Sequence, residues 1–465
     1  MREHVAGIRR VHLAVDGQGP RALASSLIFG VVPAWRATRQ STQDGLRGGR
    51  SGGMGASRDR LRSALVAAEV ALALLLLVGS GLLIRTALAL DAVDPGFDPR
   101  GLLSARVSLP RDDYLEDTRV RQTLERMVEE TRAMPGVTSA AVVSQVPLSS
   151  GGNSNGLIPE GREMSIRSVI LSQLRLVSPG YLQTMRIPLR EGRDFTDRDR
   201  RGAQKVMIVS EALARQAWPN ESAIGKRIAC CEAGPRGLRD PVFKVVVGVA
   251  ADVRWRGLAR APAPEFYLPI AQAPSNPPGA AWDWVDRTMY IVARTPGDPV
   301  ALHGGMTRVL RGIDPTLPLF NIQTMEERMQ GAMATSRFNT VLLTALGVMG
   351  LVLAAVGIYG VIACFVSQRT QEIGVRLALG AAPADVIRLV IRQALKPVLV
   401  GLVVGVVGAI AASDLLSAQL YGVTPRDPLT IMVVSVAFVL VAILASWAPA
   451  RRAARVDPTR ALSSA

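Results

Sequence analysis

The amino-acid sequence predicts an α-helical membrane protein with four transmembrane helices and a mixed α/β (α+β) extracytoplasmic domain. Three observations lead to this prediction. Hydrophobic residues make up 49% of the 465 residues and the mean hydropathy is +0.24, although only 5% of the residues are aromatic. Four apolar stretches approach the roughly 20 residues that cross a bilayer as a helix. Arginine clusters border these stretches, and one long segment between them alternates strand and helix signals.

Residues 1–60 are predicted to be a cytoplasmic or interfacial remnant of a preceding repeat, followed by a glycine-rich linker. The segment Pro33–Arg39 (PAWRATR) matches Pro449–Arg455 (PARRAAR) at a constant offset of 416 residues. Such self-similarity indicates a duplicated unit. The alternative is a chance match between two basic helix exits. The linker, Gly45 to Ser57, has the composition of a flexible chain.

Residues 61–90 hold the first predicted transmembrane helix, with Ser63 to Ile84 as its apolar part. Glu69 lies inside this apolar run. An ionisable group within a membrane helix is by default a candidate functional residue. The alternative is structural, because Glu69 lies about two turns from Arg62 and can sit near the headgroups while it faces another helix.

Residues 91–337 are predicted to form the extracytoplasmic domain, in which strands and helices alternate. The segment Glu116–Met134 puts Val120, Leu124 and Val128 on one face of a helix. Short runs of β-branched residues predict strands. The predicted strands are Leu103–Leu109, Val137–Val146, Val169–Val177, Val206–Val209, Val242–Val249 and Met289–Ala293, and the other predicted helices are Glu211–Ala217, Pro299–Gly312 and Thr324–Ser336.

The sequence contains no recognisable catalytic, cofactor-binding or metal-binding motif. Gly-x-Ser-x-Gly and His-Glu-x-x-His are absent, and Gly225–Arg227 fails the phosphate-loop pattern because Arg227 stands where Ser or Thr is required. Three histidines form no cluster and no CxxC pair occurs. Cys230 and Cys231 are adjacent, a spacing too strained for an ordinary disulfide. We therefore expect no enzyme activity, no metal site and no cofactor of this chain's own.

Residues 338–465 are predicted to hold three more transmembrane helices, a cytoplasmic loop and a basic tail. Neither Phe338–Val366 nor Pro397–Ser413 contains a charged residue. In the loop between them, apolar residues at helical spacing predict an amphipathic helix that runs directly into the next membrane helix, and Pro383 fits its first turn. The predicted parts are a transmembrane helix at 338–366, the loop at 367–396, transmembrane helices at 394–413 and 429–449, and the tail that follows.

The net charge of +16 requires that a nucleic-acid partner be considered, but the distribution of the charge argues against one. Arg36–Arg62 carries seven Arg against two Asp, and the loop at 367–396 and the tail are also basic. All three segments border apolar runs, as the positive-inside rule requires. A nucleic-acid binder gathers its basic residues on one face instead. We predict no nucleic-acid partner, both termini inside, and residues 91–337 outside.

The segment Glu372–Ala381 (EIGVRLALGA) resembles the cytoplasmic loop of FtsX-like permeases, the membrane subunits of MacB-type ABC systems. Asp94–Pro99 (DPGFDP), Arg190–Phe195 (REGRDF) and Val209–Ile228 resemble the periplasmic core of MacB-like permeases. The resemblance implies that the core has two subdomains, the inner one inserted into the outer one at about residues 180–284. It also implies a coupling helix that docks on an ATPase, through Glu372, Ile373, Gly374, Arg376, Leu377, Gly380 and Ala381.

The resemblance implies a permease subunit that transmits ATPase-driven motion from the coupling helix to the outer domain for export or efflux. ATP is then bound by a cytoplasmic ABC ATPase subunit, and the other expected partners are a second permease half or a homodimer copy, membrane lipid and a periplasmic adaptor. The expected location is the bacterial inner (plasma) membrane, multi-pass, with the large domain facing the periplasm or the outside.

Three alternatives stay open at this point. One is an FtsX-like signalling permease that activates an outer partner without transport. Another is a truncated orphan permease without a dedicated ATPase, resembling the C-terminal half of a duplicated MacB-like permease. The third is that the basic loop reflects membrane topology alone.

Overall fold

The structure is a computed structural model that describes residues 54–465 apart from 111, 150–151, 164, 235–236, 274–286, 380, 418–419 and 456–465. The chain divides into two compact units, Met1–Leu65 and Val66–Ala465. Of the first unit, the structure describes only residues 54–65, which are helical. The predicted remnant and most of the predicted linker lie outside the described residues.

Eleven strands of the second unit form one mixed sheet in the order β11-β1-β10-β2-β4-β3-β7-β8-β6-β9, with β5 paired to β8. The link from β2 to β4 is a single residue pair, Val143 with Val177. The strands are β1 Leu102–Ser108, β2 Ser139–Val143, β3 Asn153–Pro159, β4 Ile170–Val177, β5 Leu189–Gly192, β6 Val206–Ser210, β7 Arg227–Gly234, β8 Gly237–Ala250, β9 Glu265–Pro269, β10 Thr288–Arg294 and β11 Leu319–Thr324.

Beyond that link, six strands close into a ring. The pairing runs β4-β3-β7-β8-β6-β9, and β9 then pairs in parallel with β4, from Gln173 with Glu265 to Val177 with Pro269. Closure leaves these strands without a free edge between β9 and β4. The four strands β11, β1, β10 and β2 are antiparallel and form the other part of the sheet.

Both faces of the four-strand part are buried, because alternate residues of a strand point to opposite sides. Leu103 and Ile291 belong to one apolar cluster, whereas Leu102 and Val292 belong to another. The first cluster is covered by α5 (Asp117–Arg132) and α8 (Leu302–Ile313), the second by α6 (Tyr181–Met185) and by Met325. The short helix α7 (Glu211–Ala217) follows β6.

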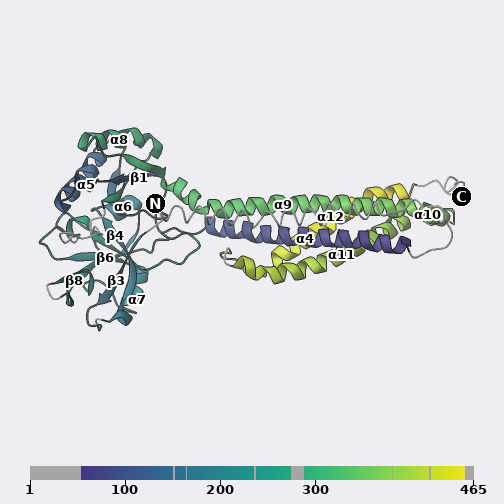
Figure 1. The fold of residues 1–465 in the computed structure, drawn as a ribbon, viewed down its shortest axis with the longest axis horizontal. Coiled ribbons are helices and arrows are strands. Elements are labelled where there is room, and N and C mark those ends of the chain that lie inside the picture. The colour runs from purple at the N-terminus through teal and green to yellow at the C-terminus, as the bar shows by residue number, and fades with distance from the viewer. Residues whose placement is uncertain are drawn as a thin grey trace. The chain divides into compact units, whose positions relative to one another are not determined.

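The membrane-type helices are α4 (Met54–Asp91), α9 (Met325–Gln368), α11 (Pro383–Leu416) and α12 (Pro428–Ala453), with the short α10 (Thr370–Ala378) between α9 and α11 (Figure 1). Small residues let them pack closely. A Cβ added at Gly350 would lie 2.8 Å from the Ala73 Cβ, and one at Gly401 would lie 2.5 Å from the Ala67 carbonyl oxygen. At the opposite end from α10, Arg85 of α4 forms an ion pair with Asp427, which caps α12 by accepting a hydrogen bond from the Thr430 N–H.

All six predicted strands and all four predicted helices of the outer domain are confirmed, with shifts at their ends. The helix predicted from Thr324 to Ser336 continues without a break into the membrane segment as α9, and α11 begins at Pro383 as predicted. The sequence reasoning missed β3, β5, β7, β9, β11 and α6, whereas α10 lies where the resemblance implied a coupling helix. The missed strands are short or polar, and long-range pairing rather than local pattern forms them. The predicted subdomain limits remain a prediction.

The prediction for the adjacent cysteines is wrong, because the structure joins Cys230 and Cys231 in a disulfide. Strand β7 leaves its regular register between Ala229 and Ala233, and Cys231 has a φ of 69°. This left-handed conformation turns the chain locally, so both sulfurs reach the same side.

Candidate functional site

Among the residues that the structure describes, four helices are long and apolar enough to cross a membrane, and their outer faces are apolar as well. In α9, Phe338 is 66% exposed, and Val341, Val352 and Val356 are similarly open. A protein that meets water on all sides does not leave such a continuous apolar surface uncovered, whereas hydrocarbon solvates it. The protein is therefore an α-helical membrane protein, as predicted.

The predicted coupling segment lies where α9 ends and α11 begins (Figure 1). Its residues Thr370–Ala378 form α10, nine residues long. Glu372 accepts a hydrogen bond from the Arg376 guanidinium at 2.6 Å, one helical turn away, and lies 3.6 Å from Arg369. Exposed pairs of this kind contribute only a few tenths of a kcal/mol, so they orient side chains more than they stabilise the helix.

The seven predicted coupling residues divide between two faces of α10. Ile373 is 3% exposed and Gly374 is buried, and Leu377 packs against the same apolar cluster of the bundle as Ile373. Glu372 and Arg376 are exposed. The inner face therefore anchors α10 on the membrane helices, and the outer face is open to another chain.

The ends of the predicted segment complete this picture. Ala381 is half-buried and donates its N–H to the Arg376 carbonyl oxygen at 3.0 Å. Gly380 lies outside the described residues. Leu379 was not among the predicted coupling residues, yet it is the most exposed large apolar side chain of the loop, at 83%. Leu379 follows Arg376 by three residues and Val375 by four, and residues at this spacing lie on the same face of a helix, which could have identified Leu379 from the sequence.

The amphipathic start of α11 continues the anchoring. Val386, Val390 and Ala394 are buried in the bundle cluster, whereas Arg388 and Arg392 are exposed. This is the helical pattern that the sequence predicted. Both α10 and the start of α11 are therefore packed against the membrane helices.

The other predicted site residue, Glu69, faces α9. A Cβ added at Gly357 would lie 2.8 Å from a carboxylate oxygen of Glu69, so this carboxylate occupies space that only a glycine leaves open. The structure thus places Glu69 toward a neighbouring helix. A transport or proton-handling role for Glu69 remains a prediction.

The first turns of α9 join the membrane helices to the sheet. Thr324 and Glu327 form a capping box, with the Thr324 hydroxyl accepting from the Glu327 N–H at 3.0 Å and the Glu327 carboxylate accepting from the Thr324 N–H at 2.9 Å. Met325 is fully buried in the second core of the sheet. Arg328 lies against β1 and donates to the Ser104 hydroxyl at 3.4 Å. The N-terminus of α9 is therefore fixed to the outer domain.

Two families match this chain. The FtsX-like permease C-terminal family matches residues 344–458, and the MacB-like periplasmic core domain family matches residues 63–309, more than half of the chain. The chain belongs to the MacB/FtsX-like permease family. The match at 344–458 includes α10 and the coupling segment of this permease, and the match at 63–309 includes Glu69.

Curated relatives of this permease carry longer chains. The macrolide export ATP-binding/permease protein MacB of Escherichia coli K12 is 25% identical over 289 residues, which cover 62% of this chain and 42% of the relative. The protein of the same name from Shigella sonnei shows the same identity and coverage. The permease therefore spans less than half of the length of these relatives.

Solved structures resemble the outer part of the permease at low sequence identity. The periplasmic region of MacB from Actinobacillus actinomycetemcomitans is 13% identical, with 51% of this chain and 94% of that chain covered and a TM-score of 0.34. The extracellular domain of the noncanonic ABC-type transporter YknZ from Gram-positive bacteria is 17% identical, with 47% and 100% covered and a TM-score of 0.30. Among the described residues of the permease, no group of three His, Cys, Asp or Glu is placed to hold a metal ion.

Proposed function

We propose that this permease is the membrane subunit of a MacB/FtsX-type ABC system and transmits ATPase-driven motion from α10 to the outer domain for export or efflux. The observation that carries the proposal is α9, one uninterrupted helix of 44 residues without proline. At 1.5 Å per residue it is roughly 66 Å long. One end is fixed to the sheet by the capping box and Met325, and the other leads into the coupling segment.

The outer face of α10 supports docking of an ATPase. It presents Glu372, Arg376 and Leu379, a charged pair beside an exposed apolar side chain. Buried apolar anchors surrounded by polar groups are typical of protein interfaces. Because Ile373 and Leu377 fasten the helix to the bundle, a partner that moves α10 also moves the membrane helices.

The remaining partners and the location follow from the same proposal. The ATP-binding part is a separate cytoplasmic subunit, and its involvement is supported by the relatives named macrolide export ATP-binding/permease protein. A second permease half or a second copy completes the membrane unit, and a periplasmic adaptor meets the outer domain. The permease lies in the bacterial inner membrane with α10 inside, since the loop around α10 and the tail carry an excess of Arg.

Energy imposes a limit on this mechanism. An ATPase shifts the outer domain only by as much as its affinity differs between the two conformations of the permease. Loss of the docking face must therefore uncouple the two sides even if each folds normally.

The test is co-purification. The tagged permease is extracted from its native cells in a mild detergent, the co-purifying chains are identified, and vanadate-sensitive ATP hydrolysis is measured. We expect an ABC ATPase to co-purify. The double variant Arg376→Glu with Leu379→Asp should reduce the recovered ATPase at least tenfold, about the effect of 1.4 kcal/mol, without lowering the amount of permease in the membrane.

A matched double variant serves as the control. Arg311→Glu with Val300→Asp reverses one charge and replaces one exposed apolar side chain by Asp, as the α10 variant does, but in the outer domain, and it should leave ATPase recovery unchanged. Unchanged recovery in the α10 variant would overturn the docking assignment. Recovery of the ATPase with an outer partner but without any exported compound would favour the signalling alternative.

A further inference from the structure

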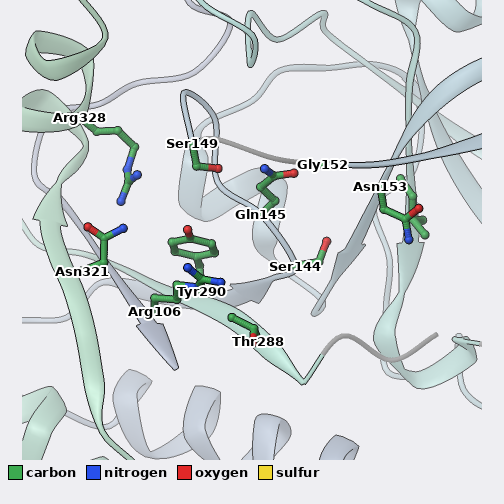
Figure 2. Close-up of a pocket in the computed structure, with 11 residues that line it drawn as sticks. Arg106, Ser144, Gln145, Ser149, Gly152, Asn153, Thr288, Tyr290, Asn321 and Arg328 are labelled. Atoms are coloured by element: carbon green, nitrogen blue, oxygen red, sulfur yellow. The ribbon is translucent and has the colours of Figure 1, made fainter. Parts of the chain in front are cut away.

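A polar cavity of about 360 Å³ opens on the face of the sheet that carries Tyr290 (Figure 2). Strands β1, β10 and β11 contribute Arg106, Tyr290 and Asn321, and α9 contributes Arg328. The segment after β2 adds Ser149. Small-molecule sites are typically 300–1,000 Å³ in volume, so this cavity has the size of a ligand site.

Arg328 is a buried charge without a carboxylate. Arg328 is 7% exposed, and its buried Nε atom has no hydrogen-bond partner. Within the described residues, its one hydrogen bond is the 3.4 Å contact of the guanidinium with the Ser104 hydroxyl. None of the eleven described residues that line the cavity is acidic. An arginine cannot escape the cost of burial by losing its proton, and an uncompensated buried charge costs several kcal/mol.

A neighbouring arginine shows the usual solution to this problem. Arg175 is 2% exposed, and its guanidinium Nε lies 2.7 Å from the Glu265 carboxylate, which is also buried. Buried arginines are normally paired in this way. The contrast indicates that the counter-charge of Arg328 comes from outside the described residues.

A second guanidinium faces the same cavity. Arg106 lies 5.9 Å and Arg328 5.7 Å from the centre of the Tyr290 ring, and the buried Nε of Arg106 also has no hydrogen-bond partner. Like charges repel each other, and an anion bound in the cavity would offset the positive charge of both groups. Figure 2 shows the side chains of Arg106, Arg328 and Asn321 around Tyr290.

A bulge in β11 brings Asn321 to this position. The pairing of β1 with β11 shifts between Ser104 and Arg106, and Asn321 has a φ of 52°. Asn and Asp tolerate this left-handed conformation better than other non-glycine residues. Bulges of this type re-aim a side chain and are frequent beside functional sites.

We propose that this cavity binds a small organic oxyanion, a phosphate- or carboxylate-bearing molecule whose charged group binds Arg328, with Arg106 lining the same cavity. Planar guanidinium groups bind both oxyanions through paired charge-assisted hydrogen bonds. The Asn321 amide and the Ser149 hydroxyl can donate further hydrogen bonds to it. This proposal is independent of ATPase docking on α10, because it rests only on residues of the outer domain and the first turn of α9.

The body of the ligand is polar. A second cavity of about 570 Å³ shares Ser149 and Gly152 with the first one. It is lined by Trp255 and Gln173, whose Nε1 and Oε1 atoms are buried without hydrogen-bond partners. Ser149, Ser154, Arg256 and Arg260 also line this cavity, and a hydroxyl-bearing body can form hydrogen bonds with these polar groups, which an alkyl chain cannot do. Hydroxylated oxyanions such as sugar phosphates and sugar acids are therefore the chemical class that fits.

The experiment uses the full chain in a neutral detergent and four probes. Glucose 6-phosphate, gluconate and inorganic phosphate carry the oxyanion, and glucose is the uncharged match. Binding is measured by isothermal titration calorimetry and by the shift of the melting temperature. We expect saturable binding of at least one sugar oxyanion and none of glucose. The comparison of glucose 6-phosphate with gluconate distinguishes a phosphate ligand from a carboxylate ligand.

Two variants locate the site. Arg328→Met should weaken anion binding at least about tenfold, the loss expected for a charge-assisted hydrogen bond, while the ligand-free protein melts at the same or a higher temperature. Asn321→Asp places a carboxylate beside Arg328 and should abolish binding while it raises the melting temperature. Arg311→Met, which removes the same charge from an exposed position of α8, should bind as the wild type does.

The proposal is overturned if none of the three anions binds saturably at millimolar concentration. It is equally overturned if Arg328→Met and Asn321→Asp both bind as tightly as Arg311→Met. If Arg328→Met fails to fold, Asn321→Asp alone decides, because the carboxylate supplies the counter-charge that Arg328 lacks.

Discussion

Asp98 shows how single side chains hold the loops of the outer domain together. Its carboxylate accepts hydrogen bonds from the Arg100 N–H at 3.1 Å and the Arg186 guanidinium at 2.7 Å, and it lies 3.9 Å from the Arg294 guanidinium. Burial acts to raise the pKa of Asp98, but the hydrogen bonds from Arg100 and Arg186 outweigh it and lower the pKa to about 2.

The lowered pKa predicts a pH-dependent contribution of Asp98 to stability. Because the pKa of Asp98 is lower in the folded state, its ionised carboxylate stabilises the folded state fully at pH values above the unfolded pKa of 3.8. This contribution is lost as the pH falls through about 2. We expect Asp98→Asn to lower the free energy of unfolding by about 1 kcal/mol at pH 7, after allowance for solvent screening. Thermal melting of both proteins from pH 7 to pH 2 checks this.

The control is Asp113→Asn, an exposed position where the same substitution should change little at any pH. The gap between wild type and Asp98→Asn should shrink as the pH falls from 4 toward 2. A gap that stays constant over this range would contradict the assignment of the effect to the carboxylate.

Residue-level prediction was least complete for the coupling segment and the cavity. From the sequence, the charged, small and apolar residues of the loop were assigned to one docking surface. In the structure, Ile373 is buried against the membrane helices and Arg376 is exposed, so the two lie on different faces of α10. Arg106 lies far in the sequence from Asn321 and Arg328, and the three residues carry no local motif. Only the sheet register and the bulge in β11 bring them to one cavity.

At the scale of elements, the membrane stretch Phe338–Val366 was predicted to be continuous with the helix Thr324–Ser336, and the two form the single helix α9. A charge-free membrane stretch and a capping box give both parts a strong local signal. The strands of the ring, in contrast, were only partly predicted. Segments such as β3 (NSNGLIP) and β7 (RIACCEAG) lack clear alternation, so their strand form depends on partners distant in the chain.

Gly331 offers a test of α9 as a rigid connection. It lies in the helix, and a Cβ added there meets no atom within 4 Å. Gly331→Ala should therefore stabilise the protein by about 0.5–1 kcal/mol, because alanine restricts the unfolded chain and favours helix. Gly331→Pro removes a helical hydrogen bond and kinks the helix, at a cost of about 3 kcal/mol.

The functional readout is hydrogen–deuterium exchange of β1 and β11 with and without ATP and vanadate. Under the proposed function, Gly331→Ala retains the nucleotide-dependent change in exchange. Gly331→Pro should lose that change although the ATPase still co-purifies. A Gly331→Pro variant that responds like Gly331→Ala would show that motion does not pass through the first turns of α9.

At the scale of the whole molecule, the arginine distribution predicts which parts face the cytoplasm. A variant with Cys364→Ser carries a new cysteine either at Arg311, in the outer domain, or at Ala378, at the end of α10; both positions are exposed. In intact spheroplasts, a membrane-impermeant maleimide should label only the cysteine at position 311. Permeabilised cells should show labelling at both positions, which is the control. Labelling of position 378 alone in intact spheroplasts would show that the permease has the opposite orientation, with α10 outside.

The sequence by itself determined the four membrane helices, the large domain between the first two, and the existence of most helices of that domain. These features depend on composition and on short periodic patterns, which act within one segment. The tertiary structure alone decided the closure of β9 onto β4, the two faces of α10 and the pairing of buried charges. Each of these depends on which distant segments meet, and a side chain is buried, paired or left without a counter-charge only once they do.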